Sequence, residues 1–335
     1  MIVYSIEFVV LGCSLLFDCH QIVDGILEAE KDSKAIGTTK RGIGPCYSTK
    51  TIRNGLRAGD LLHFESFEEK LRSLLGWLQK RYDFEYDVEA EVTKYKGYAD
   101  LLKDQIVDTT MILKESFDKG DKVLIEGANA ALLDIDFGTY PYVTSSNTTI
   151  GGVFTGLGIP PSRLSGCIGV VKAYTTRVGA GPFPTELFDD VGAHLAKVGH
   201  EFGTTTGRPR RCGWLDVPML QYSHALNGYS SMNLTKLDVL TGLADIKIGA
   251  KYIDSRTKKE LPPGYFPDHL DDLKCVEVEY QTMPGWTEDI SKIRSYDDLP
   301  VAAQNYIRRI EQLVQVPFSW IGVRILIILF LCLKF

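Results

Sequence analysis

The chain has 335 residues, a net charge of −6 at neutral pH, and 44% hydrophobic residues, which is ordinary for a globular protein with a sizeable core. The acidic balance excludes a broad surface that follows the phosphates of a nucleic acid, so any basic site must be local. Seven scattered cysteines without a CxxC pair predict neither a zinc site nor a disulfide framework, and the cytoplasm is the expected compartment.

The two ends of the chain are apolar. Residues 1–17 contain Glu7 and lack a basic start, which disfavours a signal peptide and favours one or two buried strands. Residues 324–335 hold nine unbroken apolar residues, whereas a bilayer span needs roughly 17–25. We expect a core strand or an apolar tail there, and no membrane function.

Between the ends, apolar residues recur at helical spacing. A capping box of Ser66 and Glu69 predicts a helix over 66–80, and a second helix runs from Leu102 to Phe117 and stops at Gly120. Further helices are expected near 186–198 and 299–314.

Two apolar runs, "KVLIEG" at 122–127 and "CIGVVKAY" at 167–174, predict buried strands. Helices alternating with apolar strands predict an α/β fold, one large domain over residues 1–335 with a mainly parallel central sheet. In such sheets ligands bind beyond the carboxyl ends of the strands, so the loops that follow apolar runs are the candidate sites.

The first candidate loop covers residues 36–60. Its glycines free the backbone to approach a ligand, and Lys40, Arg41 and Lys50 add positive charge, which together suit a phosphate. A glycine-rich turn with solvated charges explains the pattern equally well.

The second candidate loop covers residues 126–152. Asn129 can donate to and accept from a heterocycle edge, and "VTSSNTT" supplies hydroxyls, although a turn before a helix explains most of them. Asp134 and Asp136 fit either a metal site or an exposed strand edge.

The third candidate loop is "EFGTTTGRPRRCGW", residues 201–214. Arg208 and Arg210 offer bidentate forks, Pro209 stiffens the backbone, and threonines surround them. Clustered arginines repel one another, so we expect a small, multiply anionic ligand to relieve them.

The fourth candidate loop contains T-K-L-D at 235–238, after an apolar strand. It resembles the N-K-x-D signal of GTP-binding proteins, whose aspartate accepts from the guanine N1–H and amine. A strand end with paired charges is the alternative.

Four long blocks resemble the adenylosuccinate synthetase family, in a match that runs from about residue 16 to residue 323, with 1–15 and 324–335 divergent. The blocks are "GIGPCYSTKTIR", "EGANAALLDIDFGTYP", "KAYTTRVGAGPFPTE" and "TTTGRPRRCGWLD". The resemblance implies a P-loop-NTPase-like carbon–nitrogen ligase that joins IMP and L-aspartate in purine biosynthesis. GTP phosphorylates the purine 6-oxygen, Mg²⁺ assists, and the aspartate amine then displaces the phosphate.

The resemblance also implies site residues in a cytoplasmic homodimer. Lys50 is the catalytic position of the signature. The IMP pocket is implied at Thr39, Arg53 (reaching the neighbouring subunit), Asn129, Thr144, Val178 and Arg208. Aspartate is implied at Thr204, Thr205, Thr206, Gly207, Arg208 and Arg210, and GTP at Arg210, Lys236, Leu237 and Asp238.

The family's glycine-rich G-D-E-G-K-G-K phosphate loop, with its catalytic aspartate and magnesium ligand, has no counterpart before Ile36, so no metal ligand is predicted. Asp18 and His20 match a later helical segment of the family. One hypothesis is therefore an N-terminally truncated, impaired homologue that binds nucleotide or forms dimers. The other is the active ligase, and a guanine-nucleotide switch is a weaker third.

Overall fold

The structure is a computed structural model that describes residues 8–31, 36–203, 207–323 and 330–332. The chain falls into two compact units. Unit 1 comprises Met1–Ala128, Thr144–Asn147 and Gly152–Pro160, and unit 2 comprises Asn129–Val143, Thr148–Gly151 and Pro161–Phe335.

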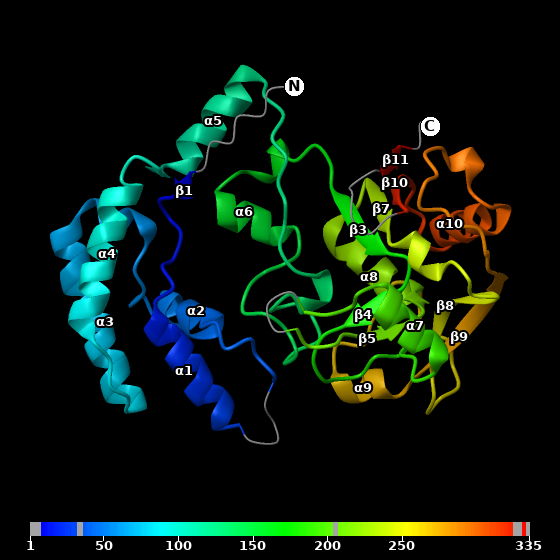
Figure 1. Cartoon of the computed structure of the whole chain (residues 1–335), viewed down its shortest axis with the longest axis horizontal. Helices are drawn as coiled ribbons and strands as arrows, with labels where there is room; N and C mark the ends of the chain where they lie inside the picture. Colours follow the sequence, from blue (N-terminus) through cyan, green and yellow to red (C-terminus); the bar gives the residue numbers. More distant parts are fainter. Residues whose placement is uncertain (1–7, 32–35, 204–206, 324–329, 333–335) are drawn as a thin grey trace. The chain divides into compact units, whose positions relative to one another are not determined.

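Unit 1 is mostly helical (Figure 1). Its described elements are β1 (Val9–Val10), α1 (Asp18–Ala29), α2 (Ile43–Thr51), the 3-10 helix η2 (Ala58–Leu62), α3 (Phe64–Tyr82), α4 (Val88–Leu102), β2 (Ile106–Val107), α5 (Thr109–Lys119) and nearly all of α6 (Gly151–Leu157). Strands β1 and β2 pair in parallel, so the apolar N-terminal segment supplies a short strand, which is half-buried and not buried as expected. Residues 1–7 lie outside the described part.

Helix α3 confirms the amphipathic pattern read from the sequence. Its buried residues are Phe67, Leu71, Leu74, Leu75 and Leu78. The predicted start at Ser66 is wrong, because the Phe67 amide already donates to the carbonyl of the N-cap His63 at 3.0 Å. The helix follows directly on η2, so the chain is already turning when α3 begins.

The helix predicted from Leu102 to Phe117 is wrong over its first part, because Leu102 is the last residue of α4, β2 follows, and helix resumes only with α5. The break arises because β2 pairs with β1 and because Asp108 caps α5, accepting from the Thr110 amide at 2.9 Å. The predicted stop is confirmed, since Gly120 ends α5 in the left-handed region at φ 79°.

The strand predicted at 122–127 is not formed. These residues have no regular secondary structure, and Leu124 is 90% exposed. An apolar run becomes a strand only where a neighbouring strand takes its backbone hydrogen bonds, and no strand among the described residues lies beside this one.

Unit 2 contains the larger sheets (Figure 1). Its described elements are η3 (Ala131–Leu133), η4 (Pro161–Arg163), β3 (Ile168–Lys172), β4 (Thr175–Arg177), α7 (Asp190–Val198), β5 (Arg211–Gly213), β6 (Leu215–Asp216), α8 (Val217–Asn227), β7 (Ser231–Thr235), η5 (Leu237–Leu240), β8 (Asp245–Asp254), α9 (Leu270–Lys274), β9 (Val276–Pro284), η6 (Tyr296–Asp298), α10 (Val301–Val314), β10 (Phe318–Gly322) and β11 (Phe330–Cys332).

The central sheet of unit 2 has the order β11-β10-β7-β3. Strands β3, β7 and β10 run parallel, and β11 is antiparallel to β10. A second sheet, β6-β8-β9, pairs β6 and β8 in parallel, and β4 and β5 form an antiparallel pair. The α/β class with a mainly parallel central sheet is therefore confirmed. Of the two alternatives expected for residues 324–335, β11 corresponds to the strand.

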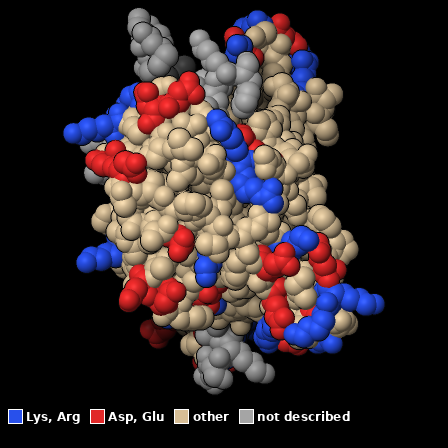
Figure 2. Space-filling view, turned by 90° about the vertical axis from the view of Figure 1, so that its right-hand side faces the viewer, with Lys and Arg blue, Asp and Glu red and all other residues tan. Residues whose placement is uncertain are grey.

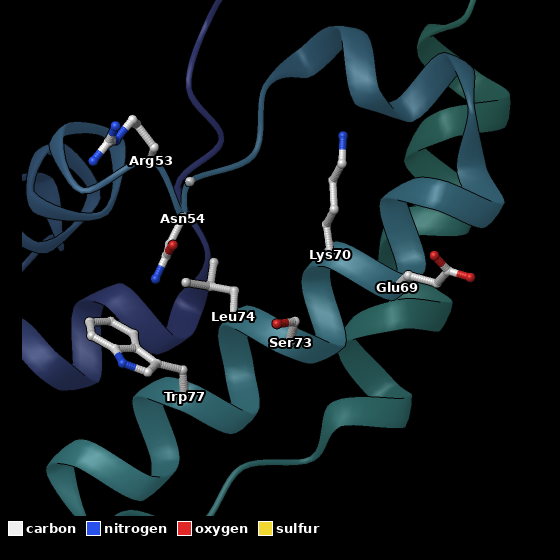
Figure 3. A pocket seen from close by; sticks show the side chains of 8 residues that line it. Arg53, Asn54, Glu69, Lys70, Ser73, Leu74 and Trp77 are labelled. Carbon is white, nitrogen blue, oxygen red and sulfur yellow. The ribbon is translucent and has the colours of Figure 1, made fainter.

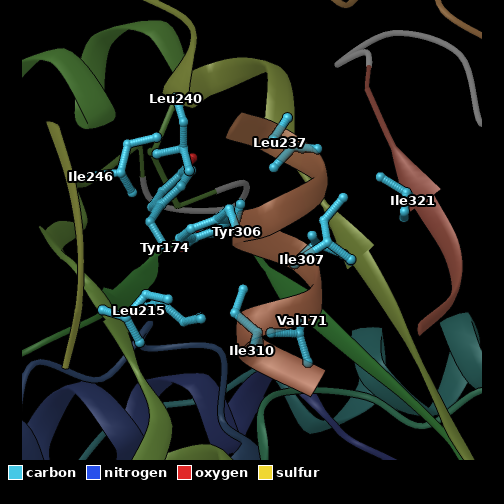
Figure 4. Close-up of a cluster of buried hydrophobic side chains, with 14 of the residues drawn as sticks. Val171, Tyr174, Leu215, Leu237, Leu240, Ile246, Tyr306, Ile307, Ile310 and Ile321 are labelled. Carbon is cyan, nitrogen blue, oxygen red and sulfur yellow. The ribbon is translucent and has the colours of Figure 1, made fainter. Parts of the chain in front are cut away.

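Helix α10 packs its apolar face into the core of unit 2, as the 299–314 pattern predicted. Figure 4 shows Tyr306, Ile307 and Ile310 among side chains of neighbouring strands, such as Val171 and Leu215. The spacing of one, three and four residues places these three side chains on one helix face. The Tyr306 hydroxyl, fully buried, donates to the carbonyl of Ala173 at 2.7 Å.

On the face shown in Figure 2, the coloured acidic and basic side chains are interspersed, with no broad basic area. Among the residues that the structure describes, no helix is both long enough and apolar enough to cross a bilayer.

Candidate functional site

The glycine loop of unit 1 is held by acidic side chains of α1. The Gly42 amide donates to Asp24 Oδ2 at 3.0 Å, and the Thr38 amide donates to Glu28 Oε1 at 3.2 Å, as does the Gly37 amide. Gly42 has φ 79°, and a Cβ there would lie 2.7 Å from the backbone of His20. In this structure the chain's own carboxylates therefore occupy these amides, which favours the glycine-rich turn over a phosphate held by the amides.

The implied IMP contact Thr39 is exposed in this loop. Lys40 and Arg41 are exposed beside it, so the side chains, and not the held amides, are the groups that can reach an anion.

Helix α2 carries the signature lysine. Lys50 is exposed in the last turn, and its ammonium lies 5.6 Å from the ring centre of Tyr47. Arg53 follows just after the helix in the left-handed region, at φ 67°. The structure therefore presents both signature cations at the same end of α2.

A pocket of about 550 Å³ in unit 1 has Arg53 in its wall (Figure 3). The residues that line it are Arg53, Asn54, Gly55, Glu69, Lys70, Ser73, Leu74 and Trp77. Lys70 is paired with Asp60 at 2.7 Å. Arg53 is exposed.

His20 of α1 is a structural residue. It is buried, and burial lowers its pKa to about 4. Its Nδ1 accepts from the Phe17 amide at 3.1 Å, so Nε2 holds the proton and faces Thr49 Oγ1 at 3.3 Å. This agrees with leaving His20 out of the predicted site.

Thr144 is another implied IMP contact. It lies in the second candidate loop, residues 126–152, in the part of that loop that belongs to unit 1. Its Oγ1 accepts from the Ser146 amide at 3.2 Å and lies 3.0 Å from the Ser146 hydroxyl. The turn before α6 expected from "VTSSNTT" is thus present.

In unit 2, Asp134 organises the segment that contains Asn129. Its fully buried carboxylate accepts from the amides of Asp136 (2.9 Å), Thr148 (2.7 Å) and Thr149 (2.9 Å). Burial alone would raise its pKa, but hydrogen bonds from Thr149 and Asp136 lower it to about 2. Neither a metal site nor an exposed strand edge describes Asp134, whereas Asn129 is exposed with φ 70°.

Val178 lies just past the end of β4 and is 45% exposed. The three threonines of the predicted aspartate loop, Thr204–Thr206, lie outside the described residues. Gly207 and Arg208 are described and exposed.

The remaining two arginines of this loop have carboxylate partners within unit 2. Arg210 pairs with Glu201 at 2.9 Å, and Arg211 forms a fork with Glu186 through its Nε and a terminal nitrogen. The repulsion from which we expected an anionic ligand is therefore relieved, for Arg210 and Arg211, by carboxylates of the chain itself.

Glu201 is the residue that the sequence reasoning missed. It is fully buried and accepts from Lys172, Arg210 and Lys236 at 2.8, 2.9 and 2.8 Å. Tyr174 donates to it as well, at 2.6 Å. A signal was present, since Glu201 is the single acidic residue between 199 and 214.

The T-K-L-D segment lies at the end of β7, as predicted. Lys236 adopts the left-handed conformation, and its ammonium donates to the Gly199 carbonyl at 2.6 Å as well as to Glu201. Asp238 follows in η5. Its Oδ1 is buried and lacks a hydrogen-bond partner among the described residues, and burial raises its pKa. A buried acceptor without a donor is suited to a ligand N–H.

Among the residues that the structure describes, no group of three or more His, Cys, Asp or Glu side chains is placed to hold a metal ion. We assign no magnesium ligand among the described residues.

Comparisons with known proteins agree with one another. The family model of adenylosuccinate synthetase matches residues 7–325. An adenylosuccinate synthetase of Paramecium tetraurelia is 55% identical over 311 residues, which cover 90% of this chain and 71% of that protein. A chloroplastic adenylosuccinate synthetase of Zea mays is 55% identical over 313 residues, covering 92% and 64%. The solved structure of a fully ligated adenylosuccinate synthetase from Plasmodium falciparum is 50% identical, has a TM-score of 0.93, and aligns with 95% of this chain and 76% of that one. The chain belongs to the adenylosuccinate synthetase family.

Proposed function

We propose that the chain ligates IMP and L-aspartate to adenylosuccinate, with conversion of GTP to GDP and phosphate. Family membership supports the reaction, and the observation that carries its nucleotide choice is Asp238. Guanine offers an N1–H and a 2-amino group to a carboxylate at this position, and adenine lacks that pair of donors. The buried, unpartnered Oδ1 of Asp238 favours such a base.

The chemistry proceeds by two displacements. The γ-phosphorus of GTP forms a bond to the 6-oxygen of IMP and breaks its bond to the β-phosphate oxygen. IMP releases its N1 proton in this step. The aspartate nitrogen then bonds to C6 of the purine and releases a proton, the C6–O bond breaks, and phosphate leaves. Phosphoryl transfer depends on positioning and on neutralising the phosphate charges, which are the roles we propose for Arg210 and Lys50.

The other predicted residues keep their proposed roles. IMP is bound by Thr39, Arg53, Asn129, Thr144, Val178 and Arg208, aspartate by Thr204, Thr205, Thr206, Gly207, Arg208 and Arg210, and GTP by Arg210, Lys236, Leu237 and Asp238. Mg²⁺ accompanies GTP in this proposal and screens its phosphates when bound.

A direct assay tests the reaction. Purified chain is mixed with IMP, aspartate, GTP and Mg²⁺, and adenylosuccinate is followed by its absorbance. Turnover supports the ligase, whereas IMP binding by calorimetry without turnover supports the impaired homologue, an alternative that gains no support from the comparisons.

Asp238→Asn tests the base recognition. The asparagine amide still accepts from N1–H but opposes the 2-amino group with a donor, so we expect kcat/KM for GTP to fall by roughly 100-fold. Xanthine carries an oxygen at position 2, so XTP becomes the better substrate. Asp245→Asn, at an exposed position of β8, is the matched control and leaves the preference unchanged. An Asp238→Asn enzyme that still prefers GTP to XTP contradicts the assignment.

We further propose a homodimer in the cytoplasm, in which Arg53 contributes to the neighbouring subunit's IMP site. Because the Zea mays relative is named chloroplastic, the compartment needs its own measurement by cell fractionation. Sedimentation with and without IMP tests the dimer.

A further inference from the structure

Glu201 joins three segments of unit 2 through a single carboxylate. Lys172 and Arg210 donate to Oε2, whereas Lys236 and Tyr174 donate to Oε1. A carboxylate accepts about four hydrogen bonds, so Glu201 has no capacity left for a ligand. It therefore acts on any ligand through the side chains that it holds.

The same residue closes the base of the threonine loop. The Arg210 amide donates to the Glu201 carbonyl at 2.8 Å, and the Gly203 amide donates to the Arg208 carbonyl at 2.8 Å. Both the backbone and the side chain of Arg210 are thus fixed against Glu201, which sets where the loop begins and ends.

The cluster carries more positive than negative charge. Three cations surround one carboxylate, and each cation keeps about a quarter of its side chain exposed, 26% for Lys172 and Arg210 and 23% for Lys236. Burial raises the pKa of Glu201, but the hydrogen bonds from Lys172, Lys236 and Tyr174 outweigh it and lower that pKa to about 2, so the carboxylate stays ionised. Without it, three cations would repel one another at close range.

We propose that Glu201 is a positioning residue, whose carboxylate holds the side chains of both Arg210 and Lys236 in place. Recognition of the guanine base and placement of the phosphate-binding arginine therefore depend on one another. The proposal rests on the proposed function, in which Arg210 faces the GTP phosphates and Lys236 belongs to the guanine motif. The Arg211–Glu186 pair does not involve this carboxylate, and the IMP contacts proposed at Thr39 and Arg53 lie in unit 1.

The first test is Glu201→Gln. The amide nitrogen of glutamine is a donor, so it opposes either the Lys172 and Arg210 pair or the Lys236 and Tyr174 pair. We expect KM for GTP to rise about tenfold or more, with KM for IMP changed less than twofold. Glu186→Gln is the matched control, because Glu186 holds the adjacent arginine without touching the cluster, and it leaves both constants within twofold. A Glu201→Gln enzyme with an unchanged KM for GTP overturns the proposal.

The second test separates positioning from general stability. In the wild-type background, we measure the Kd of GTP for Arg210→Gln, for Lys236→Gln and for the double variant. We expect the fold-change of the double variant to differ by at least about threefold from the product of the two single fold-changes. In the Glu201→Gln background, we expect the fold-change of the double variant to equal the product of the two single fold-changes within twofold. A general loss of stability weakens GTP binding by both variants but does not change how their fold-changes combine. If the double variant differs from the product of the single fold-changes equally in the two backgrounds, the proposal is overturned.

Two further measurements keep the test decisive. If Glu201→Gln does not fold, the double variant Glu201→Gln, Lys172→Met is used in its place in both tests. The double variant has the same net charge in the cluster as the wild type, because one cation is removed together with the one carboxylate. Calorimetry with GTP measures binding apart from turnover. A wild-type chain that binds GTP without turnover refutes the proposed function and leaves the binding test in force, whereas one that binds no GTP refutes both.

Discussion

Asp216 should limit the stability of this protein at neutral pH. It is the N-cap of α8, its side chain is fully buried, and it accepts from the Tyr252 hydroxyl at 2.6 Å and the Met219 amide at 3.2 Å. These two bonds do not compensate for burial, which raises its pKa from 3.8 to about 6. The protonated form is therefore the form that the folded protein favours.

The magnitude follows from the pKa difference. About two pKa units correspond to ~3 kcal/mol of unfolding free energy. Between pH 4 and pH 6 the folded state binds a proton that the unfolded state has released, so the stability contributed by this site is present below pH 4 and is lost as the pH rises through 6. Asparagine mimics the protonated acid. Asp216→Asn should therefore stabilise the protein by up to ~3 kcal/mol at pH 8 and by less than ~0.5 kcal/mol at pH 4.

Urea unfolding followed by circular dichroism at both pH values measures these differences. Asp189→Asn is the control, because Asp189 caps α7 in the same way, accepting from the Gly192 amide at 3.0 Å, but is exposed. Its effect should be under ~0.5 kcal/mol at either pH. An Asp216→Asn protein that is less stable than wild type at pH 8, or whose gain is the same at pH 4, refutes the reasoning.

Three other predictions concern the two units. Leu71→Ala removes a fully buried side chain of α3 and should cost about 2–5 kcal/mol of unfolding free energy, measured by urea titration; a cost under ~1 kcal/mol contradicts the packing described. Tyr306→Phe leaves the Ala173 carbonyl without its donor and should cost about 1–2 kcal/mol in the same titration, and no change would show that the bond is unimportant. Asp24→Asn weakens the hold on Gly42 and Thr38, and should raise KM for IMP about threefold while KM for GTP stays constant; equal changes in both would point to general damage.

The sequence was most informative where structure depends on near neighbours. Helices α3 and α10 follow from apolar residues three and four positions apart, and each buries the predicted face. The end of β7 at the T-K-L-D segment could also be predicted, because a change from apolar to polar residues along the chain indicates where a buried strand ends.

Features that depend on distant partners could not be read in this way. Residues 122–127 have the composition of a strand, but composition does not say whether a neighbour is present to pair with it. Glu201 gains its role from Lys172 and Lys236, which are 29 and 35 residues away. The acidic hold on the glycine loop was missed for the same reason, since Asp24 lies 18 residues before Gly42.

The bond between Tyr306 and Ala173 also bears on how the protein is made. Its partners are 133 residues apart, and β10, which pairs with β7, comes later still. A ribosome that synthesises this chain from the N-terminus must therefore release the chain through β10 before the Ala173 carbonyl finds its donor on α10 and β7 its parallel neighbour β10. At about 5–20 residues added per second, the Ala173 carbonyl and β7 wait several seconds for these partners, which is time in which the incomplete core can aggregate.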